Sequence, residues 1–192
     1  ASDVYKRQIL QALNQKGFTM ATPVQAGAIP CFKDWKAVIA KAPTGSGKTF
    51  AFGIPMVEHT DPEGTAVTGL ILAPTRELAL QIQENFTQYG KYLPVRTAVI
   101  FGGVGQTPQI EAVQAGVDVL VATPGRLMDL RNQGHIDLTK LDMFVLDEAD
   151  RMLDMGFIHD VRRVIKLLPQ KKQTMFFSAT LPPEIMDLVD TL

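Results

Sequence analysis

The stretch A-V-I-A-K-A-P-T-G-S-G-K-T, residues 37–49, joins a short apolar run to a glycine-containing loop. The apolar part is typical of a buried strand, and F-A-F-G-I-P-M after the loop is typical of a helix. At such a helix N-terminus, the backbone N–H groups around Gly45 and Gly47 can cradle phosphate oxygens. The loop departs once from the pattern G-x-x-x-x-G-K-[ST], because Ala42 replaces the first glycine. Both glycines that must face phosphate are present, so we predict a phosphate-binding loop over residues 42–49.

The side chains of this loop have separate expected roles. Lys48 would reach the β- and γ-phosphates of a nucleotide, and the Thr49 hydroxyl would ligate Mg²⁺. The alternative is a glycine turn with a solvated lysine. The residues expected to contact the nucleotide are Ala42, Pro43, Thr44, Gly45, Ser46, Gly47, Lys48 and Thr49.

Short apolar runs recur along the chain after this point, with helical patterns between them. The runs are A-V-I-A (37–40), T-G-L-I-L-A (68–73), R-T-A-V-I-F (96–101), D-V-L-V-A (118–122), M-F-V-L (143–146) and T-M-F-F-S (174–178). Near-continuous apolar runs are typical of parallel strands buried on both faces. Leu78, Ile82 and Phe86, spaced by four, indicate a helix between two runs. We therefore predict one α/β domain over residues 1–192, a doubly wound, mostly parallel sheet with helices on both faces.

Ligands of such sheets bind at the carboxyl ends of the strands, where D-E-A-D follows M-F-V-L. Asp147 is placed to hold Mg²⁺, and Glu148 is placed to polarise an attacking water. The triplet S-A-T, residues 178–180, could hydrogen-bond Asp150 and tie the nucleotide site to the next element. The alternatives are an ordinary acidic strand end and a plain strand-to-helix turn before Pro182.

Two other strand ends carry a hydroxyl, a proline and an arginine at a predicted helix N-terminus. They are P-T-R-E-L-A (74–79) and T-P-G-R-L (123–127), and Gly102 and Gly103 follow a third run. Helix N-termini with Thr and Arg suit backbone phosphates, and glycines allow a polymer backbone to approach closely. The alternative is helix capping by the hydroxyls with solvated arginines, which concerns Thr75, Thr123, Arg76 and Arg126.

Composition narrows the class of protein but does not indicate nucleic acid. The net charge is −1, hydrophobic residues make up 46%, and Cys31 is the only cysteine, so no intramolecular disulfide can form. No apolar run approaches the length of about 18 residues that a membrane span needs. We therefore expect a soluble, cytoplasmic protein.

Several further residues have ordinary expected roles. Met152 and Met155 are expected to pack around the turn after D-E-A-D. Lys166, Lys171 and Lys172 flank Pro169 in a predicted loop, and we expect them to be solvated.

Taken in order, the motifs resemble those of the DEAD-box ATP-dependent RNA helicases. They are P-V-Q ending at Gln25, A-P-T-G-S-G-K-T, P-T-R-E-L-A, G-G, T-P-G-R, V-L-D-E-A-D and F-S-A-T. The longer stretch D-E-A-D-R-M-L-D-M-G-F further resembles the bacterial RhlE-type branch. The resemblance runs from about Ile9 to the end, and it implies the N-terminal RecA-like domain of a P-loop NTPase that hydrolyses ATP to unwind or remodel RNA.

The resemblance also implies site residues. Gln25 would read adenine, and Met20 would lie near the base through its backbone. Lys48, Asp147 and Glu148 would be catalytic, with Mg²⁺ held through Thr49 and Asp147. Asp150, Ser178 and Thr180 would couple hydrolysis to strand separation. One RNA strand would contact Pro74, Thr75, Arg76, Gly102, Gly103, Thr123, Pro124, Gly125 and Arg126 through its sugar-phosphate backbone, independently of sequence.

Two departures from the family pattern concern the chain ends. Residues 1–8 do not follow it, and we expect a truncated or foreign end there, before a Q-motif region at residues 9–30. The family's second RecA-like domain is expected as the partner, and without its arginine fingers this fragment is expected to be nearly inactive. The rival classes are a GTPase, whose N-K-x-D signature is absent, and a non-enzymatic module that binds RNA or a protein.

Overall fold

The computed structural model describes residues 38–41, 53, 56, 60, 64–89 and 95–191. No helix within these residues is long and apolar enough to cross a membrane. The elements are β1 (Val38–Lys41), β2 (Gly69–Leu72), α4 (Arg76–Tyr89), β3 (Thr97–Ile100), α5 (Thr107–Gln114), β4 (Val119–Ala122), α6 (Pro124–Asn132), β5 (Met143–Leu146), α7 (Ala149–Asp154), α8 (Ile158–Leu167), β6 (Gln173–Ser178) and α9 (Pro183–Val189).

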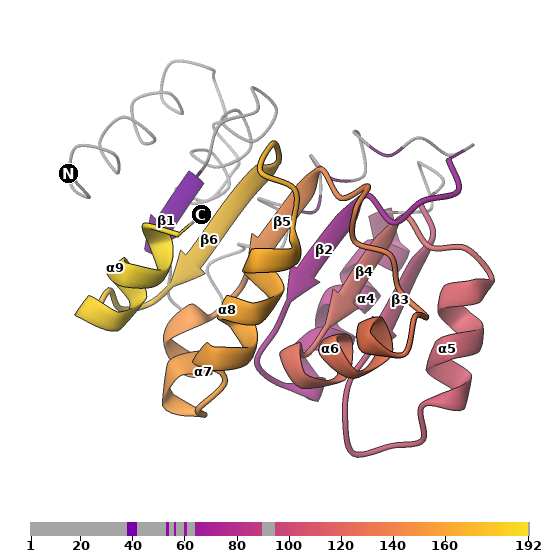
Figure 1. Cartoon of the computed structure of the whole chain (residues 1–192), viewed down its shortest axis with the longest axis horizontal. Coiled ribbons are helices and arrows are strands. Elements are labelled where there is room, and N and C mark those ends of the chain that lie inside the picture. Colours follow the sequence, from indigo (N-terminus) through magenta and orange to yellow (C-terminus); the bar gives the residue numbers. More distant parts are fainter. Residues whose placement is uncertain are drawn as a thin grey trace.

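The strands form one sheet in the order β1-β6-β5-β2-β4-β3 (Figure 1). Every neighbouring pair is parallel, so each connection must cross back over a face of the sheet. Leu72 pairs with both Ala122 and Leu146, and Lys41 pairs with Ser178. The carboxyl ends of the strands are therefore aligned, and the loops that follow them leave the sheet at one edge.

Alternation along the strands builds a core on each face of the sheet. Leu70, Leu72 and Phe144 contribute to a cluster with the buried side chains of α6, α8 and α9. Ile71 and Val145 point to the opposite face, in a cluster with buried residues of α4. Figure 1 shows the same division, with α4 behind the sheet and α6 to α9 in front. Because strand side chains alternate in direction, burial on both faces requires the near-continuous apolar runs of the sequence.

The predicted strands agree with the observed ones within one residue at each end. The helix predicted from Leu78, Ile82 and Phe86 is α4, in which Ile82 and Phe86 are fully buried. The predicted Q-motif region at residues 9–30 lies outside the described residues.

Candidate nucleotide and RNA site

The predicted phosphate loop, residues 42–49, lies outside the described residues, as do Met20 and Gln25. Its starting point is nevertheless defined by the sheet. Lys41, the last residue of β1, pairs with Ser178 at the end of β6. The chain therefore enters the predicted loop at the carboxyl edge, beside the S-A-T triplet.

The D-E-A-D element begins at the same edge, directly after β5. Asp147 is fully buried, and its backbone N–H donates to the carbonyl of Leu72 at 3.0 Å. Glu148 has φ 49° and ψ 53°, which is the left-handed region that non-glycine residues rarely occupy. Strained backbone of this kind clusters at functional sites, because only a functional gain or strong surrounding structure maintains it. The Glu148 carboxylate is also 3.5 Å from Arg151 Nη1.

Asp150 contacts the S-A-T triplet through several hydrogen bonds. The backbone N–H and the hydroxyl of Thr180 donate to Asp150 Oδ2 at 3.1 and 3.0 Å. The backbone N–H of Asp150 donates to Ser178 Oγ at 3.2 Å, and the Ser178 hydroxyl donates to the Thr180 carbonyl at 2.6 Å. The tie that the sequence suggested between β5 and β6 is therefore present, whereas its coupling role stays a prediction.

These contacts also affect the charge on Asp150. Partial burial alone would raise the pKa of its carboxyl, but hydrogen bonds from Thr180 and from the Arg151 backbone outweigh that effect and lower the pKa overall. The network thus favours the ionised carboxylate.

A groove of about 360 Å³ lies at the carboxyl edge near the other strand ends. Every residue predicted to contact RNA lines it, with the exception of Gly103. The full lining is Pro74, Thr75, Arg76, Glu77, Phe101, Gly102, Thr123, Pro124, Gly125, Arg126, Met155 and Phe157. The fold thus brings together the three segments predicted to contact RNA, which are separated by up to about fifty residues in the sequence, and adds Met155 and Phe157 to them.

Two helix N-termini face this groove. Thr75 accepts from the backbone N–H of Leu78 at 3.2 Å and so caps α4, as the capping alternative expected. Thr123 occupies the corresponding position of α6 but makes no side-chain capping hydrogen bond. Because the first N–H groups of a helix have no intrahelical acceptor, the N–H groups of Gly125 and Arg126 remain available at the start of α6. The capping alternative is therefore right for α4 and wrong for α6.

The two arginines of the groove make specific contacts, and Arg76 is also exposed to solvent, as the alternative expected. Arg76 lies over the ring of Phe101, with its guanidinium carbon 4.9 Å from the ring centroid. Arg126 donates to Gln109 Oε1 at 3.0 Å and to the Val104 carbonyl at 2.8 Å. These contacts orient the guanidinium groups before a ligand binds, which lowers the entropic cost of binding an anion.

The two glycines of the G-G pair differ in backbone conformation and in their position relative to the groove. Gly103 has φ +82°, which favours glycine for conformational reasons, and it does not line the groove. Gly102 lines the groove, and a Cβ built on it would meet nothing within 4 Å. Turn geometry therefore explains Gly103, whereas no contact with the described residues requires a glycine at Gly102.

Sequence reasoning missed several residues of this site. Phe101 and Phe157 line the groove, and buried Gln109 donates to the Phe101 carbonyl at 3.0 Å while it accepts from Arg126. Met155 was expected to pack, but it is 45% exposed and lines the groove. The position of Phe101 at a strand end was a usable signal, whereas nothing in the sequence marked Gln109, which reaches the site from α5.

The chemistry of the groove suits a sugar-phosphate chain. Free N–H groups at the helix start and two oriented guanidinium groups provide donors for phosphate oxygens. Proline, phenylalanine and methionine side chains provide apolar surface for sugar rings. Backbone N–H groups and apolar side chains carry little sequence information, and the two arginines can pair with phosphate oxygens as well as with a base edge.

Comparison with known proteins places the chain in a family. Residues 22–188 match the model described as DEAD/DEAH box helicase. The protein named ATP-dependent RNA helicase CshA from Limosilactobacillus reuteri is 45% identical over 177 residues, which are 92% of this chain and 36% of that protein. The protein named ATP-dependent RNA helicase DeaD from Escherichia coli K12 is 45% identical over 181 residues, or 94% of this chain and 29% of that protein. The chain thus spans about a third of the length of these relatives.

Solved structures agree with the sequence comparisons. A DEAD box protein from Methanococcus jannaschii superimposes with a TM-score of 0.85 at 39% identity, covering 95% of this chain and 50% of that one. A hypothetical ATP-dependent RNA helicase from Sulfolobus tokodaii gives a TM-score of 0.82 at 39% identity, covering 96% of this chain and 54% of that one. The predicted RecA-like α/β fold is confirmed, and the chain belongs to the DEAD/DEAH box helicase family.

Proposed function

We propose that this chain is the ATP-hydrolysing, RNA-binding part of an ATP-dependent RNA helicase, working with a second RecA-like domain. The observation that carries the proposal is the meeting of two helix N-termini and two oriented arginines in one groove. That groove lies on the same sheet edge as the D-E-A-D element. Both relatives described above carry the name ATP-dependent RNA helicase, which supports the same activity.

The groove would hold one RNA strand by its backbone. Phosphate oxygens would accept from the free N–H groups at the start of α6 and from Arg76 and Arg126. The small surface of Gly102 and Gly125, whose added Cβ atoms would meet nothing within 4 Å, lets the strand approach the backbone closely. Binding would be independent of sequence and would weaken with salt.

The nucleotide would bind beside β1 and β5. Gln25 and Met20 would contact adenine, and residues Ala42–Thr49 would hold the phosphates. Bound Mg²⁺–ATP supplies the anhydride bond and a cation that neutralises charge on the leaving phosphates. Thr49 and Asp147 would hold that Mg²⁺, because hydroxyl and carboxylate oxygens are ligands that this hard cation prefers. Glu148, whose backbone is strained at φ 49°, would accept the proton of the attacking water.

Coupling between hydrolysis and RNA would pass through Asp150, Ser178 and Thr180. Their hydrogen bonds join the start of α7 to the end of β6. A shift of the nucleotide-bound loop beside Ser178 would therefore move the D-E-A-D element through these hydrogen bonds. Within the family, we propose the bacterial RhlE-type branch from the stretch D-E-A-D-R-M-L-D-M-G-F, and a cytoplasmic location.

The test measures ATP hydrolysis by the chain joined to a second RecA-like domain, with and without single-stranded RNA. RNA should stimulate hydrolysis, and Glu148→Gln should lower the stimulated rate by about 10²–10⁴-fold, as expected for loss of a general base. Glu184→Gln is the matched control, because Glu184 is exposed on α9 and outside the site. Lys48→Ala should weaken ATP binding. Equal hydrolysis with and without RNA would contradict the helicase proposal.

A further inference from the structure

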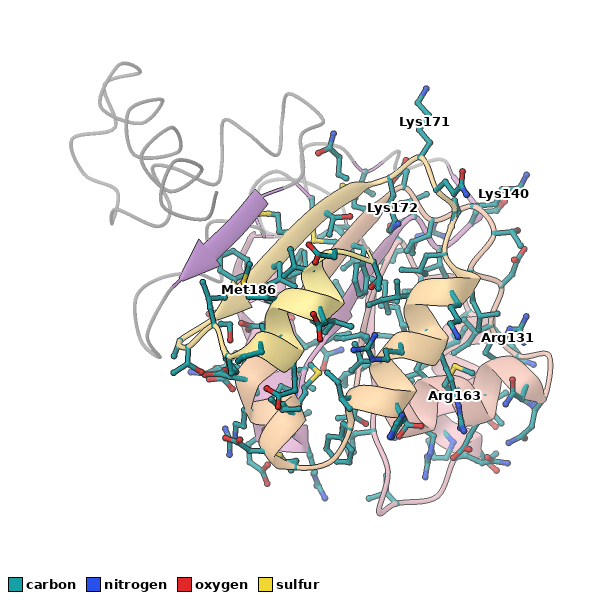
Figure 2. All side chains as sticks on the ribbon, turned by 60° about the vertical axis from the view of Figure 1, so that its left-hand side comes forward. Arg131, Lys140, Arg163, Lys171, Lys172 and Met186 are labelled. Carbon is teal, nitrogen blue, oxygen red and sulfur yellow. The ribbon has the colours of Figure 1, made fainter. Side chains whose placement is uncertain are left out.

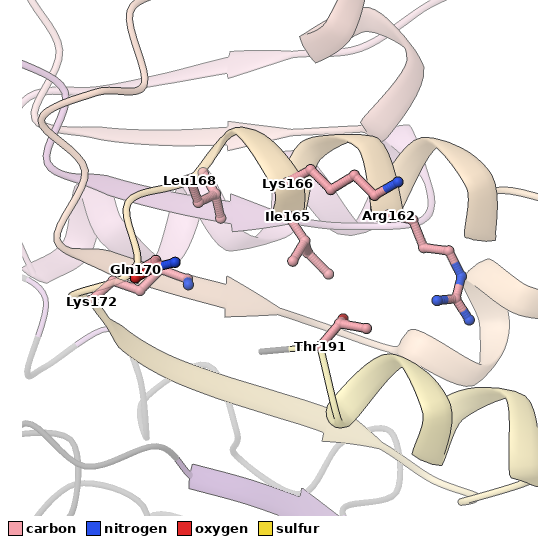
Figure 3. Close-up of a pocket in the computed structure, with 7 residues that line it drawn as sticks. All are labelled: Arg162, Ile165, Lys166, Leu168, Gln170, Lys172 and Thr191. Carbon is pink, nitrogen blue, oxygen red and sulfur yellow. The ribbon is translucent and has the colours of Figure 1, made fainter.

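A second pocket, of about 470 Å³, lies between α8, the loop before β6 and the end of α9 (Figure 3). Three cationic side chains line it: Arg162 and Lys166 from α8, and Lys172 from the loop. In Figure 3, Lys172 lies at one end of the pocket and Arg162 at the other. The volume falls within the range of about 300–1,000 Å³ that is usual for small-ligand sites.

The rest of the lining divides into an apolar wall and polar groups. Ile165 and Leu168, each 7% exposed, form the apolar part. The Gln170 amide can donate, and the Thr191 hydroxyl, which itself donates to the Leu188 carbonyl at 2.6 Å, can accept. The pocket therefore offers both cationic and apolar surface to one ligand.

Among the described residues, the three cations have no carboxylate partner. No carboxylate of the described residues lies within 4.0 Å of Arg162, Lys166 or Lys172, although other arginines of the described part do form such pairs. Lys172 is partly buried, and burial lowers the pKa of its ammonium group. Taking a charge out of water without a partner is costly, and a bound anion would remove that cost.

The pocket is separate from the groove and from the nucleotide motifs. Lys172 directly precedes β6, so it lies at the amino end of that strand, whereas Ser178 lies at the carboxyl end. A strand of this length spans about 20 Å. A ligand here would occupy the opposite edge of the sheet from the site described above.

We propose that this pocket binds a phosphate-bearing ligand, with the phosphates held by Arg162, Lys166 and Lys172 and an apolar portion packed on Ile165 and Leu168. Cations at both ends favour a ligand with more than one phosphate, and guanidinium and ammonium groups both pair well with phosphate oxygens. The phosphates could belong to a free phosphorylated compound or to an RNA strand. The proposal does not depend on the helicase function.

The experiment titrates inorganic pyrophosphate into this chain by calorimetry, with Lys48→Ala present throughout to weaken the predicted phosphate loop. Lys166→Ala and Lys172→Met should each weaken binding by about tenfold or more, as expected for loss of a charged hydrogen bond. Lys171→Ala is the matched control, because it removes the same charge one residue away. Figure 2 shows Lys171 pointing away from the protein body, and it does not line the pocket.

Thermal unfolding of each variant distinguishes a loss of pyrophosphate binding from a loss of folding. Pyrophosphate should raise the unfolding temperature of the parent chain and of Lys171→Ala, but not that of Lys172→Met. If single-stranded RNA also weakens pyrophosphate binding, the natural phosphates are those of RNA; if it does not, the ligand is a free phosphorylated compound. The proposal is overturned if pyrophosphate does not bind, or if Lys171→Ala weakens binding as much as Lys166→Ala and Lys172→Met do.

Discussion

Replacing Gly125 by alanine should stabilise the protein and lower its affinity for RNA. Gly125 is the second residue of α6, is exposed, and lacks the positive φ that would make a side chain strained. A Cβ at this position would meet nothing within 4 Å. Glycine costs a helix about 0.5–1 kcal/mol relative to alanine, so a gain of about 0.5 kcal/mol is expected near the helix end. That gain corresponds to a rise of roughly 1–2 °C in unfolding temperature for a chain of this size.

The same methyl group would occupy space that the proposed RNA strand needs. It would lie beside the free N–H groups of Gly125 and Arg126, and loss of one charge-assisted hydrogen bond there costs about 1.5–3 kcal/mol. We therefore expect RNA affinity to fall by about 10- to 100-fold. The assay is fluorescence anisotropy with labelled single-stranded RNA at fixed salt, since salt alone changes such affinities.

Gly105 provides a matched control for this variant. It is also exposed with nothing within 4 Å of an added Cβ, but it does not line the groove. Gly105→Ala should therefore leave RNA affinity unchanged. A Gly125→Ala chain that is more stable yet binds RNA as tightly as the parent would refute the assignment of the groove.

The remaining predictions concern the loop and the hydrogen-bond networks. Gly103→Ala should lower the free energy of unfolding in urea by about 1 kcal/mol, because alanine is strained at φ +82°, whereas Gly102→Ala should leave stability nearly unchanged. Gln109→Met should cost about 1–2 kcal/mol in the same assay, since it removes the partner of the buried Phe101 carbonyl; a change below about 0.3 kcal/mol would count against the network. Thr180→Val should cost about 0.5–1 kcal/mol at pH 7. The pKa of Asp150 is lowered in the folded protein, so this stabilisation is present above the unfolded-state value of about 3.9 and is lost as the pH falls through the lower, folded value. Urea titrations at pH 7 and pH 3 check that sign, and Thr180→Ser, which keeps the hydroxyl, should behave like the parent.

The order of secondary structure could be predicted because local chemistry determines it. Continuous apolar runs such as residues 143–146 are typical of strands buried on both faces, and the repeat of Leu78, Ile82 and Phe86 at a spacing of four is typical of a helix. The contact between Asp150 and Thr180 was also predictable, because both residues follow strands whose carboxyl ends meet at one edge.

Features that depend on tertiary contacts could not be predicted in this way. The sequence does not indicate that Gln109 on α5 reaches Arg126, because the contact depends on how α5 packs beside β3. The lysines near Pro169 illustrate the same limit. Lys166 lies in α8 and not in the predicted loop, but it is exposed, so the expectation of solvation holds for Lys166 and Lys171. It is wrong for Lys172, which is partly buried in a pocket.

The strand order has a mechanical consequence for how ATP and RNA would communicate. The strands followed by predicted nucleotide-site residues, β1, β6 and β5, are neighbours, and so are the strands followed by predicted RNA-site residues, β2, β4 and β3. The sheet thus has a nucleotide half and an RNA half, and the two halves meet between β5 and β2. The backbone N–H of Asp147 donates to the Leu72 carbonyl across this boundary, at the edge where both ligands would bind. Movement at the nucleotide site would pass to the RNA side through the backbone hydrogen bonds between β5 and β2, and the one from Asp147 lies at the edge where both ligands would bind.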